Sequence, residues 1–205
     1  MNRDEYTSPV SVLSHGLDKQ NRLASLNALL SERINNSDQS SIHRMFDELL
    51  SIAEDAGSSG LAEKEERLDT LSGKLSRSRI ELLKEAELLD AMRMTNDSYI
   101  SALEDDITKA QEYLKAGIED GNPDARVIYD TMEKRLQELS VTRSVGISFS
   151  EQIKYSRSNL LSLSERIRDV QMNLIPLLRG RMSAEASKVT CDALRTMIVN
   201  IFRGA

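Results

Sequence analysis

The 205-residue sequence has few of the residues on which β-rich and α/β proteins depend. It contains no tryptophan, three phenylalanines, three prolines and nine glycines, and only 4% of its residues are aromatic. A β-sandwich or an α/β enzyme needs more aromatic and turn-forming residues than this. The composition favours long helices, because 40% of the residues are hydrophobic and 29% are charged.

Residues that carry chemistry are also scarce. Cys191 is the one cysteine, which excludes an internal disulfide and a paired-cysteine metal or redox site. The two histidines, His15 and His43, lie too far apart for an HExxH zinc motif, and no glycine-rich phosphate loop or GxSxG motif occurs. We therefore expect no catalytic residue, no metal site and no cofactor, and we interpret the protein as a non-enzyme.

Long apolar runs are absent, so no segment approaches the length of a membrane span. The N-terminus has no apolar signal-peptide core, which predicts a cytoplasmic protein. A pI near 5.1 and scattered tyrosines argue against nucleic-acid binding. Residues 1–123 hold 14 basic and 24 acidic residues (net −10), and residues 124–205 hold 13 and 9 (net +4). We favour pairing between the two segments over a membrane-surface role for the basic one.

Turn residues divide the chain into helices. Gly57–Gly60 and Gly121-Asn122-Pro123 are strong breaks, and Pro176 indicates a kink. We expect one elongated helical domain over 18–205 after a mobile tail over 1–17. Its predicted parts are short helices over 18–34 and 39–56, long helices over 61–116 and 123–178, and a final helix over 182–203.

Heptad spacing predicts that the two long helices form an antiparallel, coiled-coil-like hairpin with the shorter helices packed on it into a bundle. Apolar residues recur every three or four positions along both helices, with one additional four-residue step from Leu82 to Ala86. Pairing the two stripes around the glycine turn places particular residues opposite one another: Ile100 with Leu139, Arg93 with Gly146, Asn96 with Thr142, and Glu104 with Arg135. In this register Arg93 must reach water or a carboxylate, since a buried unpaired guanidinium is costly.

Three arginines flank the apolar stripe of the second long helix: Arg135, Arg143 and Arg157. A guanidinium matches the geometry of an oxyanion, which makes these residues candidates for binding one. The simpler interpretation, which we favour, is that they pair across the hairpin with Glu104, Asp97 and Glu81.

Several segments resemble the bacterial TelA-like toxic-anion (tellurite) resistance family. The resemblance lies in Glu133–Leu136 (EKRL), Thr142-Arg143, Gln152-Ile153 and Ile175–Leu177 (IPL), and residues 82–117 are similar to the preceding helix of that family. The family usually has Trp and Lys after the IPL segment, where this chain has Leu178 and Arg179. Members continue into further C-terminal helices, so the resemblance implies a short or truncated member.

The resemblance implies a helical protein that acts through protein partners in bacterial stress response. The partners would be other proteins or a second copy of the chain. It supplies no catalytic residues. Two alternatives stay open at this point, namely a protein that binds or reduces an oxyanion directly and a coiled-coil structural scaffold.

Overall fold

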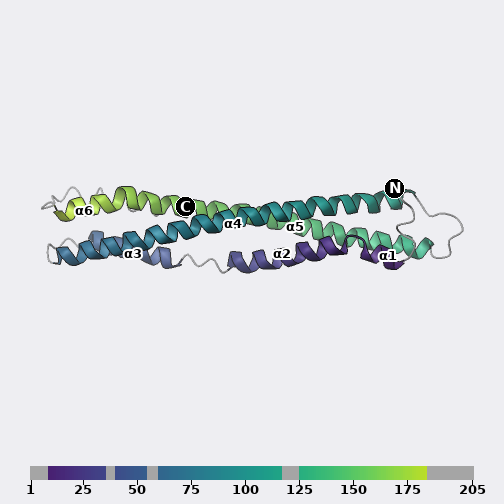
Figure 1. Ribbon diagram of the computed structural model, residues 1–205, viewed down its shortest axis with the longest axis horizontal. Coiled ribbons are helices and arrows are strands. Elements are labelled where there is room, and N and C mark those ends of the chain that lie inside the picture. Colours follow the sequence, from purple (N-terminus) through teal and green to yellow (C-terminus); the bar gives the residue numbers. More distant parts are fainter. Residues whose placement is uncertain (1–8, 36–39, 55–59, 117–124, 184–205) are drawn as a thin grey trace. The chain divides into compact units, whose positions relative to one another are not determined.

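Figure 1 shows the computed structural model, which describes residues 9–35, 40–54, 60–116 and 125–183. Within these ranges every regular element is helical, which confirms the predicted all-α class. The elements in chain order are α1 (Pro9–Ser14), α2 (Leu17–Asn35), α3 (Ser40–Glu54), α4 (Leu61–Ala116), α5 (Ala125–Asp169), the π-helix η2 (Val170–Leu174) and α6 (Ile175–Ser183). The bounds of α4 match the predicted helix over 61–116.

The chain divides into two compact units, whereas the sequence predicted one domain over 18–205. The first unit comprises Met1–Asn36 and Leu88–Ser156, and the second comprises Ser37–Glu87 and Arg157–Ala205. The long helices α4 and α5 each contribute one part to both units. The reason is that each unit has its own short helices: α1 and α2 belong to the first, and α3 belongs to the second.

In the first unit α4 and α5 run antiparallel, as predicted, and α1 and α2 pack on them. Two apolar clusters form its core, and each combines residues of α4, of α5 and of the N-terminal helices. One cluster holds Val12, Ala110, Ile128 and Met132. The other holds Leu23, Ile100, Leu103, Ile107 and Leu139. In this unit α2 is the predicted short helix that packs on the hairpin.

In the second unit α3 buries one face: Ile42, Met45, Phe46, Leu49, Ile52 and Ala53 are all buried. Arg67 of α4 pairs with Glu48 at 3.5 Å, and Arg181 of α6 donates to the Ala53 carbonyl at 2.8 Å. Gln171 donates to Ser76 Oγ at 2.6 Å, which joins the C-terminal segment to α4. These contacts hold α3 and the C-terminal segment on the first half of α4.

The prediction of a mobile tail over 1–17 is wrong for residues 9–17. Pro9 opens α1, a position at which its missing amide hydrogen is no loss, and Val12 is fully buried. Gly16 then adopts a positive φ of 67°, and its carbonyl accepts the first hydrogen bond of α2 from the Gln20 amide at 3.0 Å. Residues 1–8 lie outside the described ranges.

The predicted long helix over 123–178 is observed from Ala125 as a continuous helical run of α5, a π turn and α6, and the irregular turn lies directly before Pro176, where the sequence indicated a kink. Pro176 has no amide hydrogen, and its ring would clash with the carbonyl four residues earlier in a regular helix. The wider π turn avoids this clash, and the Ile175 amide bonds to the Val170 carbonyl five residues back. The added residue shifts the buried face, so Leu178 is buried while Leu177, three residues after the buried Leu174, is 44% exposed.

Gly180 lies inside α6, and the helix continues through it to Ser183. The rest of the predicted final helix, together with Cys191, falls outside the described residues.

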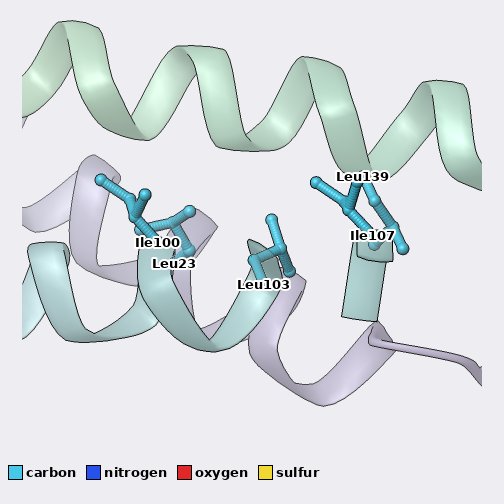
Figure 2. Close-up of a cluster of buried hydrophobic side chains, with 5 residues drawn as sticks. All are labelled: Leu23, Ile100, Leu103, Ile107 and Leu139. Carbon is cyan, nitrogen blue, oxygen red and sulfur yellow. The ribbon is translucent and has the colours of Figure 1, made fainter. Parts of the chain in front are cut away.

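The predicted register of the hairpin is wrong by about one heptad in the first unit. Figure 2 shows Leu139 beside Ile107, whereas Ile100, its predicted partner, lies beside Leu23. A Cβ on Gly146 would lie 3.0 Å from Ile100 Cγ1, so Gly146 faces Ile100 and not Arg93. An apolar stripe that repeats every seven residues matches its partner nearly as well after a shift of seven, so the stripe alone does not select the register.

Candidate functional site

The turn between α1 and α2 lies against the hairpin of the first unit. At Gly16, a Cβ would lie 3.1 Å from Leu139 Cδ2 and 3.2 Å from Asp106 Oδ2. The positive φ already favours glycine, and this close approach adds a second reason. The turn therefore brings the end of α1 and the start of α2 onto Asp106.

Asp106 is the centre of a polar cluster at this turn. The residue is only 5% exposed, and its carboxylate Oδ1 lies 2.7 Å from Lys19 Nζ. Lys19 also donates to the Ala102 carbonyl at 3.2 Å. His15 Nε2 lies 2.8 Å from the Asp106 carbonyl oxygen, which can only accept, so this nitrogen carries a proton. A buried carboxylate requires such compensation, and α2 supplies it through Lys19.

Arg135 of α5 completes the cluster from the other arm of the hairpin. It is 4% exposed, its Nε donates to the His15 carbonyl at 2.8 Å, and its Nη1 pairs with Glu138 at 2.7 Å. Its Nη2 is buried and has no hydrogen-bond partner in the described ranges. The guanidinium thus ties the α1–α2 turn to α5.

An open hollow of about 340 Å³ lies beside this cluster, on the side of α1 and α4. Its lining combines two lysines, two aspartates, a histidine and small polar side chains: Ser11, Ser14, His15, Gly16, Leu17, Asp18, Lys19, Asp106 and Lys109. Positive and negative charges balance there, and Lys19 is already paired with Asp106. The lining therefore favours neither an anionic nor a cationic ligand.

A second polar group is buried further along the hairpin. Asn96 is fully buried, and its Nδ2 donates to the Gly146 carbonyl at 2.9 Å and to Ser150 Oγ at 2.7 Å. Ser150 donates to Asp97 at 2.5 Å, and Asp97 pairs with Arg93 at 2.9 Å. Asn96 thus forms a buried polar layer, but its partners are Gly146 and Ser150 and not Thr142, the residue that the predicted register placed opposite it. Arg93 reaches carboxylates on its own helix, as the sequence required.

The three predicted oxyanion candidates are not brought together. Arg143 pairs with Glu104, the carboxylate that the predicted register assigned to Arg135. Arg135 instead holds the His15 carbonyl and Glu138, and Arg157 is half-buried in the second unit. Whether any of them binds an anion stays a prediction.

The cluster around Asp106 was not predicted from the sequence, although one signal was available. Asp106 lies three residues after Leu103 and four before Ala110, so it shares the helical face of two core residues. A charged residue at such a position must find a buried partner. The partner, Lys19, is 87 residues away in sequence, and only the folded chain identifies it.

At the exposed start of α2, the Asp18 carboxylate accepts a hydrogen bond from Arg22 and raises the pKa of that guanidinium. This ion pair connects adjacent turns of one helix, so it stabilises α2 locally and contributes little to the site.

No protein family, curated protein or solved structure matches the chain. In the described helices no apolar stretch is long enough to cross a membrane. The same ranges contain no group of three or more His, Cys, Asp or Glu side chains arranged to hold a metal ion. The family resemblance thus rests on the sequence segments alone.

Proposed function

We propose that the protein is a non-enzymatic helical protein of the toxic-anion (tellurite) resistance class that acts through protein partners in bacterial stress response. The family resemblance supports the class, and a surface feature supports the mode of action. Val141 and Val145 of α5 are 64% and 44% exposed. They are one turn apart, so they lie next to each other on the helix surface.

The arginines on the same helix support this choice over direct anion binding. Arg143 is engaged by Glu104, and Arg135 is engaged by Glu138 and a backbone carbonyl. An anion would have to displace a carboxylate that already matches the guanidinium. The exposed valines have no such internal partner to displace, and an apolar partner surface would remove them from water.

The proposal is tested by placing charges on the two valines. A Val141→Lys/Val145→Lys variant should retain its helicity and melting temperature, because both positions are on the surface, but lose tellurite resistance in a host that lacks the native gene. The matched control is Ser148→Lys/Gln152→Lys, which adds the same charge at the same spacing on exposed positions of α5. The control should preserve resistance.

Equal resistance of the two variants would contradict the role of the valine surface. Calorimetry on the purified protein tests the alternative function. Tellurite binding that disappears in Arg143→Ala would show direct anion binding and would overturn the proposed mode of action.

A further inference from the structure

The helix α2 buries fewer apolar side chains against the first unit than α3 buries against the second unit. Among the described side chains of the 19-residue α2, only Leu23, Leu30 and Asn27 are buried. The shorter α3, with 15 residues, buries six apolar side chains. Two further leucines of the α2 segment, Leu17 and Leu29, are 43% and 59% exposed. Less buried apolar area means a smaller free energy of docking for α2.

One of the three buried side chains of α2 opposes its docking. Asn27 is 6% exposed, and its Oδ1 is buried with no hydrogen-bond partner in the described part of the chain. An amide oxygen in this state loses its hydrogen bond to water and gains nothing in return. A leucine at this position would dock better, so the sequence of α2 is not optimised for tight attachment.

The surface beneath α2 is shaped for a helix. Gly146 leaves a notch, in which a Cβ would lie 3.0 Å from Leu23 Cδ2 and 3.0 Å from Ile100 Cγ1. Leu23 fills this notch and joins the cluster that includes Leu103 and Leu139 (Figure 2). Removal of α2 would expose this cluster to water.

A helix that occupies this surface must bring a positive charge to Asp106. Asp106 is 5% exposed and is compensated by Lys19, four residues before Leu23 in α2. Any helix that replaces α2 must supply a cation at that position, because an uncompensated buried carboxylate is strongly unfavourable. Gln20 adds a hydrogen bond to Thr142 at 2.9 Å on the other arm.

We propose that α2 is an exchangeable occupant of this surface, and that the protein partner binds there by inserting an amphipathic helix of the same pattern. The partner helix carries a lysine or arginine four residues before a leucine, and a second apolar residue seven positions after that leucine, as Lys19, Leu23 and Leu30 do in α2. This inference rests on the proposed function; it adds a second contact surface to that of Val141 and Val145, and it names the chemistry of the partner helix.

The probe is a fluorescent peptide of residues 9–35, added to the full-length protein. The peptide should be captured, and Asn27→Leu in the full-length chain should weaken capture by about tenfold because its own α2 then docks more tightly. The control is Leu29→Asn, the reverse exchange at an exposed position of the same helix, which should leave capture unchanged. Lys19→Ala in the peptide should weaken its capture, because the peptide then brings no cation to Asp106 while the chain's own α2 still does.

Hydrogen exchange of the unmodified protein provides the second measurement. Amides of residues 21–34 should exchange at least about tenfold faster than those of residues 100–107, once intrinsic rates are corrected, because α2 detaches without unfolding of the hairpin. Equal exchange rates, or a peptide that is not captured by any variant, would overturn the proposal. The valine variants separate the proposed function from the displacement of α2. If Val141→Lys/Val145→Lys loses tellurite resistance while the amides of α2 and of the hairpin exchange at equal rates, the proposed function stands and the displacement of α2 is refuted.

Discussion

Single glycine residues at backbone turns determine how two of the helices begin. Gly16 and Gly60 are the described glycines with positive φ, and each directly precedes a helix, α2 in one case and α4 in the other. Gly16 is the more constrained, since only 3.1 Å separates the position of its missing Cβ from Leu139. At Gly60 the nearest such atom is 3.8 Å away. Two glycines with the same backbone conformation therefore differ in how tightly they are packed.

Replacement of Gly16 by alanine should lower the free energy of unfolding by about 1–3 kcal/mol, because a left-handed conformation and a tight contact are combined there. Urea denaturation followed by circular dichroism measures this value. Gly73→Ala is the matched control: Gly73 lies inside α4 with no atom within 4 Å of the added Cβ. That change should stabilise the protein by about 0.5–1 kcal/mol, since alanine is the better helix former. Equal effects at both positions would refute the role of the Gly16 turn.

At the scale of elements, the C-terminal segment shows how one proline changes a helix without ending it. The chain stays helical through Pro176, but the π turn η2 takes the place of a regular turn. The buried face then resumes at Ile175 and Leu178, which are 3% and 2% exposed. Helical periodicity along this segment is therefore interrupted by a local backbone change, and the positions after it follow a shifted pattern.

Replacement of Pro176 by alanine should stabilise the protein by about 1–3 kcal/mol, because the steric reason for the π turn is removed and an amide donor is restored. The restored regular helix should rotate α6, so Leu177 should become protected from water. Thermal denaturation and side-chain labelling at a Leu177→Cys position, in a Cys191→Ser background, measure the two effects. Gly180→Ala in the same helix provides the comparison, and it should add about 0.5–1 kcal/mol without altering the labelling.

At the scale of the whole molecule, the register of the hairpin depends on polar and small residues and not on the apolar stripes. Asn96 is satisfied in part by the Gly146 carbonyl and Ser150, and Gly146 provides the space for Leu23. A shift by one heptad would separate Asn96 from both partners and place another residue beside Leu23. One buried polar layer in a long apolar interface is a known determinant of register.

Paired cysteines in the first unit test this register. In a Cys191→Ser background, cysteines at Ile107 and Leu139 should form a disulfide readily under mild oxidation, whereas cysteines at Ile100 and Leu139 should not. Non-reducing electrophoresis after proteolysis between the two arms detects the link. Preferential linking of positions 100 and 139 would show that the register expected from the heptads is the correct one after all.

The sequence by itself determined the all-α class, the bounds of α4 and the antiparallel direction of the hairpin. These features follow from local rules: helical periodicity, turn residues, and the connection of two long helices by a short glycine-containing segment. The four-residue step from Leu82 to Ala86 was also predicted from spacing alone, and both residues are buried.

Only the tertiary structure decided three features: the register of the hairpin, the ordered structure of residues 9–17 and the cluster around Asp106. The physical reason is the same in each case, since the deciding contacts join residues that are distant in sequence. Lys19 meets Asp106 across 87 positions, and Arg135 meets the His15 carbonyl across 120. A heptad repeat makes several alignments of two helices nearly equal in apolar contact, and such long-range polar contacts select one of them.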